Sequence, residues 1–518
     1  MPQATLAILV DWNNDGDFTD SDDDITGDVL SVTWKRGRDY ASQLSGRSRA
    51  GKLTAVLVNT DGKYSPSNTD SDLSGSLLPG RTVKVTAGSG SFPYLFPMSF
   101  SSRPHFVGKL ERIVPSPSSR AVKTCKLIAF GSLGYLNAFR PALATQTNRR
   151  TDQAVGDILD DVGWGAGDRD LATGQTTMAR FWVDGKRTME ALRIVEETEG
   201  GFIKEKKNGD IGFESRHTRL ASPYNTSQVT FSDASDATYT YESISQDDPL
   251  STITNHLEAS ARTYTTASAA ALWTHPETGS DSPSLVPGEA KTVEAFYPNP
   301  SSANNALEVN AWTTPAATTD YLANTASDGS GTNRTSSLTV TNAKTAERMA
   351  ITVSNGHATD VVYLTKVQAR GTAVTSNNPV KVRAIDSTSQ SSYGERKYSA
   401  KTEFIPTSAE AQSWCDYQLS IYASPVEILT LNFNANLSAA NLSQALSREI
   451  SDRITVVAAN DAKLGINADF FIESEQHTIT RGGTQHIVSW QLSPATGGYT
   501  QFWVLDTGKL GTSTIPAY

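Results

Sequence analysis

The sequence of 518 residues contains few of the residues that build covalent or metal-linked scaffolds. Its two cysteines, Cys125 and Cys415, lie far apart, so neither a disulfide framework nor a cysteine-based zinc site is expected. The seven histidines are scattered and show no HExxH or similar spacing, which argues against a metalloenzyme. No apolar run approaches the roughly 18 residues of a membrane-spanning helix. No basic segment precedes the first apolar run, so no signal peptide is expected.

Charged residues are also scarce, and the acidic ones are in excess. Lys and Arg total 45 against 55 Asp and Glu, which gives a formal net charge of -10. A protein that grips nucleic acid by its phosphates normally carries the opposite sign. An acidic surface could line a conduit through which DNA slides, but acidity of this size is also typical of ordinary solubility.

The composition and length predict a mainly β fold with several domains. The chain exceeds what one hydrophobic core usually supports, and its 37 glycines with many Ser and Thr favour strands and turns. Short strand-like segments separated by Gly and Asp clusters fill both ends of the chain, as in barrels or sandwiches. Two β-barrel domains are predicted, at 1–135 and at 238–265 plus 381–505, followed by a C-terminal tail at 506–518.

The middle of the chain changes character. Apolar residues of one helical face recur after Thr151, and a second helix is expected from Thr188 to the Gly200-Gly201 pair. Asn208-Gly209 predicts a tight hairpin turn. These signals indicate a small α+β domain at 136–237. Polar low-complexity loops then alternate with strand-like pieces, which predicts an inserted β-sandwich at 266–380.

The sharpest local motif is DWNNDGDFTDSD, which runs from Asp11 to Asp22. Oxygen-bearing side chains occupy loop positions 1, 3 and 5, Gly16 permits the turn, and position 7 would ligate through its backbone carbonyl. Position 12 is Asp rather than the usual Glu, so Asp23 or Asp24 could close the loop instead. The alternative is an acidic, solvated loop held by Asx turns. The motif predicts a structural calcium ion or a similar cation, held by Asp11, Asn13, Asp15, Asp17 and Asp22.

Catalytic interpretations are weaker, and no catalytic residue is predicted. Glu196, Glu197 and Glu199 could supply the carboxyl pair of a glycosidase, but they occupy polar positions of one predicted helix, so a solvated face is favoured. His477 and His486 flank a TRGGT turn, and they are expected to lie close together on the surface. The chain is therefore predicted not to be an enzyme.

The order of the segments is more informative than any single motif. The opening LVDWNNDGDFTD is followed by NTDGKYSPSN and LLPGRTVKV, then by a helix before Gly163-Trp164, the hairpin GGFIKEKKNGDIGFESR, and FFIESEQHTIT near the end. This order resembles that of tail-hub and minor tail proteins of siphophages and prophages. The resemblance covers most of the chain outside roughly 266–380.

The resemblance implies a baseplate-hub fold, in which a homotrimer with two β-barrels per subunit forms a pseudo-sixfold ring at the phage tail tip. The implied partners are the distal tail and tail tube proteins, the tape measure protein, and tip or fibre proteins, with DNA only in transit through the lumen during ejection. Such a protein is assembled in the host cytoplasm and resides in the virion. The insert could be an outward decoration that contacts carbohydrate or neighbouring proteins.

Two other classes of protein stay open. One is a calcium-dependent adhesin or carbohydrate-binding β protein, which the acidic loop and the insert would suit. The other is a cell-wall hydrolase, which would have to use the carboxylates near Glu196.

Overall fold

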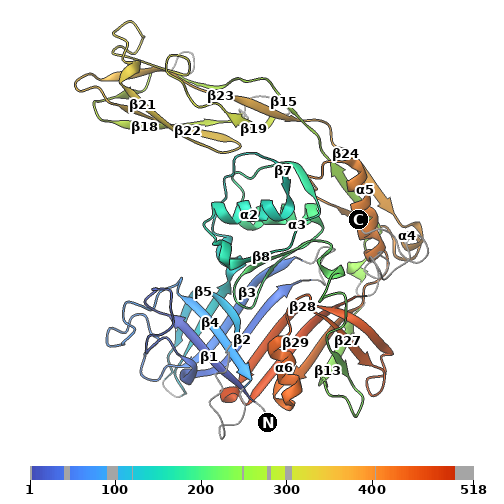
Figure 1. Ribbon diagram of the computed structural model, residues 1–518. Coiled ribbons are helices and arrows are strands. Elements are labelled where there is room, and N and C mark those ends of the chain that lie inside the picture. The colour runs from blue at the N-terminus through green and yellow to red at the C-terminus, as the bar shows by residue number, and fades with distance from the viewer. Residues whose placement is uncertain are drawn as a thin grey trace.

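The computed structural model describes residues 3–39, 47–89, 103–118, 121–247, 250–276, 282–297, 306–402 and 404–495. Strands dominate this part of the chain, so the predicted mainly β class is confirmed. In Figure 1 a broad sheet forms the lower body, helices α2 and α3 lie above it, and an elongated pair of sheets extends across the top. Among the described residues, no helix is both long and apolar enough to cross a membrane.

Twelve strands form one continuous sheet in the lower body (Figure 1). The strand order is β1-β4-β5-β6-β3-β2-β28-β29-β26-β13, with β27 beside β28 and β12 beside β27. The N-terminal strands are β1 (Ala4–Asp11), β2 (Val29–Arg38), β3 (Ser48–Val58), β4 (Thr82–Ser89), β5 (Arg103–Ser116) and β6 (Thr124–Gly131). The C-terminal strands are β12 (Thr230–Ser232), β13 (Ser243–Asp247), β26 (Ile428–Asn434), β27 (Arg453–Ala458), β28 (Ile466–Thr480) and β29 (Gln485–Pro494).

The strand pairings of the described residues close neither half of this sheet into a separate barrel. Instead β2, from the N-terminal half, pairs antiparallel with β28, from the C-terminal half. Each strand supplies the backbone partners that the other would lack at an open edge. Each half keeps its own apolar core, and Ile479 of β28 reaches across into the core of the N-terminal half.

The segment between the two halves contains the predicted helices and hairpin. Helix α2 spans Thr151–Asp161, and α3 spans Thr188–Glu199 and ends at Gly200, whose φ of 68° is the left-handed cap that glycine favours. Gly209 has a φ of 90° in the turn of the predicted hairpin. The other elements here are α1 (Ser132–Leu136), β7 (Gln146–Arg150), β8 (Arg169–Leu171), β9 (Thr177–Phe181), β10 (Phe202–Glu205) and β11 (Ile211–Glu214).

Two sheets share one apolar core in the upper part of Figure 1. The larger sheet gathers β15 (Tyr264–Thr266), β16 (Ala270–His275), β17 (Ser284–Leu285), β19 (Ala306–Trp312) and β20 (Tyr321–Asn324) along β23 (Val362–Ser376). The smaller sheet consists of β18 (Ala290–Phe296), β22 (Arg348–Asn355) and β21 (Leu338–Lys344).

A third small layer links this upper part to the body. Helix α5 (Ser408–Tyr422) packs on a three-stranded sheet through Trp414 and Cys415. That sheet consists of β24 (Val380–Ile385), β14 (His256–Ala261) and β25 (Lys397–Ser399). Two further helices are α4 (Ser387–Tyr393) and α6 (Ala439–Ser447).

Candidate functional site

The two halves of the large sheet meet along a seam, the seven paired positions from Ser31–Thr480 to Gly37–Ser474 on β2 and β28. Successive residues of a strand point to opposite faces, so charged residues in phase with Trp34 and Ile479 face the interior. The interior side of the seam and the segments packed on it carry buried ion pairs that we call the seam network. Its members are Arg36, Arg38, Lys204, Glu214, Arg219, Glu449, Glu473 and Glu475.

Arg36 joins three separate parts of the chain through one guanidinium group. Its Nε donates to Glu475 Oε1 of β28 at 2.8 Å, and its Nη1 donates to the Glu205 carbonyl oxygen of β10 at 2.8 Å. Its Nη2 forms an ion pair with Glu449, which follows α6. The Arg36 side chain is 1% exposed and that of Glu475 is also 1% exposed, so their contact lies in a region of low dielectric constant, whereas Glu449 is 22% exposed.

Glu473 is the second centre of the network. Its Oε2 accepts from Arg38 Nη1 at 2.7 Å, and its Oε1 accepts from Arg219 Nη1 at 2.7 Å and from Ser493 Oγ at 2.6 Å. Burial by itself would raise the pKa of this carboxyl group, but the two guanidinium groups lower it to about 2. Glu473 is therefore ionised throughout the physiological pH range.

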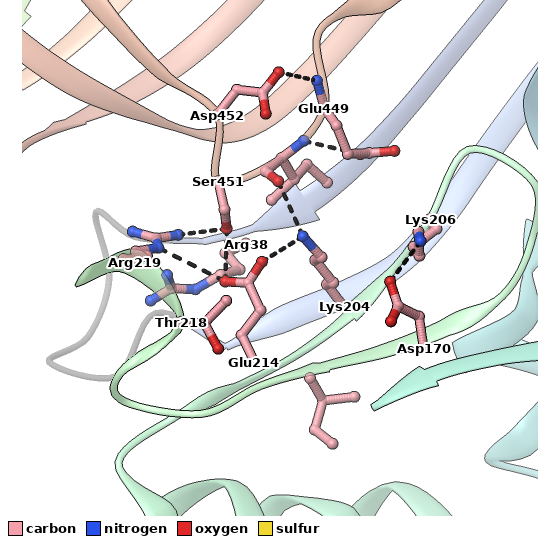
Figure 2. A network of polar contacts seen from close by, with 12 residues as sticks. Arg38, Asp170, Lys204, Lys206, Glu214, Thr218, Arg219, Glu449, Ser451 and Asp452 are labelled. Carbon is pink, nitrogen blue, oxygen red and sulfur yellow. Dashed lines mark hydrogen bonds and ion pairs between the residues drawn. The ribbon is translucent and has the colours of Figure 1, made fainter. Parts of the chain in front are cut away.

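Figure 2 shows how the hairpin of β10 and β11 is tied to the segment before β27. Lys204 pairs with Glu214 across the hairpin, and its Nζ also donates to the Ile450 carbonyl oxygen at 3.0 Å. Ser451 Oγ donates to Glu214 Oε2 at 2.7 Å and accepts from Arg219 Nη2 at 2.9 Å. These bonds fix the middle segment against the C-terminal half of the sheet.

A cluster of buried aromatic rings lies beside the network. Trp34 stacks on His477 with ring centroids 4.7 Å apart, and His477 Nδ1 lies 2.9 Å from His486 Nε2. The predicted proximity of the two histidines is confirmed, but their predicted surface position is wrong, because both are almost fully buried on central strands of the sheet. His105 is fully buried, and neither of its ring nitrogens has a hydrogen-bond partner among the described residues.

The predicted solvated face of α3 is also wrong. Glu196, Glu197 and Glu199 are 3%, 9% and 0% exposed, because other segments cover the helix on the side that carries them. Glu199 Oε2 accepts from Thr151 Oγ1 at 2.7 Å, and Glu197 Oε1 accepts from the Tyr398 hydroxyl at 2.8 Å. The cavity beside Glu196 and Glu197 measures about 20 Å³, space for roughly one water molecule and not for a sugar. These carboxylates therefore hold segments together.

The acidic loop has the turn that its motif requires, with Gly16 at a φ of 93°. Asn13, Asp15 and Asp17 form Asx turns, in which each side-chain oxygen accepts the backbone N–H two residues further on, at 3.1, 3.0 and 2.9 Å. The Asp11 carboxylate also accepts from the backbone N–H groups of Asp15 and Gly16. Asp22 instead pairs with Lys63 at 3.2 Å. Within the described ranges, no group of three or more His, Cys, Asp or Glu side chains is arranged to hold a metal ion. The contacts seen are those of the Asx-turn alternative, and calcium stays a prediction.

Known proteins resemble this chain in fold but not in sequence. No family model matches the chain, and no curated protein matches it. A tail protein from Neisseria meningitidis MC58 matches with a TM-score of 0.50 at 9% identity, covering 95% of this chain and 97% of its own. The resemblance predicted from the order of segments is therefore confirmed at the level of the fold, which is that of a tail protein over nearly the whole chain.

Two further solved structures are similar at lower scores. The 43 kDa tail protein of prophage MuSo2 from Shewanella oneidensis has a TM-score of 0.48 at 10% identity, covering 94% of this chain and 98% of its own. A prophage tail protein from Listeria monocytogenes EGD-e has a TM-score of 0.41 at 9% identity, covering 94% of each chain.

Removing one partner of the seam network is predicted to destabilise the fold strongly. Glu473→Gln leaves Arg38 and Arg219 buried beside a neutral amide, and the expected loss is about 3–5 kcal/mol in the free energy of unfolding. Urea denaturation followed by tryptophan fluorescence measures it. The matched control is Lys397→Met, which removes the exposed partner of Glu258 and should cost at most about 1 kcal/mol. Equal losses in the two variants would contradict the prediction.

Acid is predicted to weaken the sheet through its buried histidines. Burial lowers the pKa of His105 from 6.5 to about 2 and also lowers the pKa values of His477 and His486. Below pH 6.5 the unfolded chain therefore binds more protons than the folded chain, so the free energy of unfolding falls as the pH decreases. The melting temperature should fall steadily from neutral pH into mild acid.

The contribution of His105 can be separated from that of other groups. His105→Phe should reduce the slope of stability against pH by about 1.4 kcal/mol per pH unit, the value for one proton. His275→Asn, which changes a histidine of β16 outside the seam, should leave the slope unaltered. An unchanged slope in the His105 variant would show that this ring does not remain neutral in the folded chain.

Calcium removal tests the loop motif. If the loop binds calcium, a chelator should lower the melting temperature, because a ligand that binds only the folded state stabilises it. Asp15→Ala should abolish that sensitivity, whereas Asp70→Ala, at an exposed aspartate outside the loop, should retain it. A melting curve that the chelator leaves unchanged would rule out the cation.

Proposed function

We propose that this chain is a structural subunit of a phage tail, and that it forms the hub ring at the tail tip. The fold shared with the Neisseria meningitidis tail protein supports a structural role in a tail. The observation that carries the finer proposal is the seam, which joins two sheet halves with separate cores into one continuous sheet.

The seam suits a ring because the pairing of β2 with β28 fixes the orientation of one half of the sheet relative to the other. Three chains with two β units each supply six positions around an axis, and such a ring closes only if the units keep a fixed relation. We assign these units to 1–135 and to 238–265 plus 381–505, with the α+β domain at 136–237, whose strand β12 joins the large sheet beside β27. The ring would connect the distal tail and tail tube proteins to tip or fibre proteins, hold the tape measure protein, and pass DNA during ejection.

The part from 266 to 380 is proposed as an outward β-sandwich. In Figure 1 it extends away from the large sheet, which leaves it accessible to carbohydrate or to neighbouring proteins. A role in adhesion could therefore accompany the hub role. A cell-wall hydrolase is disfavoured, because Glu196, Glu197 and Glu199 are committed to structural hydrogen bonds.

The oligomeric state of the purified full chain tests the proposal. Light scattering after size exclusion should give three times the mass of one chain, and negative-stain class averages should show a threefold ring with a central hole. The same preparation should not clear peptidoglycan. A solitary particle without a threefold axis, or turnover that is lost in Glu196→Gln, would overturn the proposal.

A further inference from the structure

A basic groove lies along the seam, on the side that exposes Lys35 and Lys52, and Arg36 and Arg38 of the seam network also contribute to its lining. The groove has a volume of about 430 Å³ and runs across β6, β3, β2, β28 and β29. Lys35, Lys52 and Arg49 are exposed along it, and the only acidic side chain on its described wall is Asp39, which pairs with Arg49.

Two lysines of the basic groove lie opposite each other, and no acidic side chain that the structure describes neutralises their positive charges. Lys35 of β2 and Lys52 of β3 are direct cross-strand partners, and the next residues in this row are Gln476 on one side and Phe130 on the other. Neither lysine has an ion-pair partner among the described residues. Like charges placed directly opposite on neighbouring strands destabilise a sheet. An anionic partner would remove that cost.

The acidic loop from Asp11 to Asp24 is a surface of the opposite sign. Seven aspartates and no lysine or arginine lie between Asp11 and Asp24. Among the residues that the structure describes, Asp22 is the one aspartate of this loop with an ion-pair partner, Lys63, while Asp17, Asp20 and Asp24 are exposed.

The acidic loop does not reach the basic groove of its own chain. Four strands, β4, β5, β6 and β3, separate β1 from β2 in the sheet order. The side chains of the loop contact one another, Lys63, Lys84 and Tyr64, none of which lines the basic groove. Both surfaces are thus left open on one chain, and each has the charge that the other lacks.

We propose that the acidic loop of one copy, through Asp17, Asp20 and Asp24, docks into the basic groove of the next copy at Lys35 and Lys52. Such a contact joins two different surfaces, so it is heterologous, and repetition about an axis closes a ring. The inference rests on the proposed ring and identifies one of its contacts. Nucleic acid is a weaker occupant, since the chain carries a net charge of -10 and the groove offers few unpaired cations.

Charge reversal tests the contact with the full chain. Lys35→Glu with Lys52→Glu should weaken self-association at least about tenfold, and Asp17→Lys with Asp20→Lys should do the same. The variant that combines all four changes restores opposite charges between positions 17 and 20 and positions 35 and 52, and should recover the assembly. Wild-type association should also weaken with added salt. Sedimentation velocity over a range of protein and salt concentrations measures each effect.

The controls separate charge from folding and from calcium. Lys381→Glu with Lys463→Glu reverses two exposed lysines outside the basic groove and should leave association unchanged. Substitution of Asp17 and Asp20 leaves the side chains of Asp11 and Asp15, which are predicted calcium ligands, unchanged. Circular dichroism verifies the fold, and should a reversed variant misfold, the neutral pair Lys35→Gln with Lys52→Gln replaces it and should also weaken association.

The possible outcomes distinguish this contact from the ring itself. A wild-type chain that stays monomeric at every concentration overturns both the ring and the contact. A ring that is indifferent to the reversals, or is not restored by the fourfold variant, overturns the contact alone. An intact ring that loses retention of a DNA fragment on Lys35→Glu with Lys52→Glu identifies the basic groove as a nucleic-acid surface, and also overturns the contact.

Discussion

The architecture depends on the ion pairs buried behind the β2–β28 seam. A buried charge is costly unless it is paired and its remaining hydrogen-bonding capacity is filled, so such a network tolerates few geometries. Arg36 meets this condition only when β28, β10 and the segment after α6 are all in place, since each provides one acceptor. The network therefore favours one arrangement of the two sheet halves and the middle segment. Apolar packing alone would discriminate less strongly between alternative arrangements.

The same principle extends into the middle segment through α3. Its three buried glutamates each bond a different part of the chain, and Glu197 reaches the layer under α5 through Tyr398. Glu199 holds the start of α2 through Thr151. A helix whose polar side binds neighbouring segments acts as a brace between them. Polar contacts on several elements at once thus hold these segments together.

Local structure was predictable from the sequence, and long-range pairing was not. The helices after Thr151 and from Thr188 are predictable because apolar spacing and end signals are local. The seam joins residues such as Arg36 and Glu475 that lie 439 positions apart, which no local pattern reports. The burial of these two side chains could have been inferred. Arg36 lies two residues from Trp34 and Glu475 lies four residues from Ile479, so each points to the same face of its strand as an apolar residue. For α3, the periodicity showed a polar face but not the segments that cover it.

Alternation along β2 couples the interior of the sheet to its exterior. One register places Arg36 opposite Glu475 on the inside and Lys35 opposite Gln476 on the outside. A slip of one residue would exchange the two faces, burying Lys35 and exposing Arg36. Because the buried ion pairs make such a slip costly, they also determine which basic side chains line the basic groove. The surface that we assign to assembly therefore exists only while the seam network is intact.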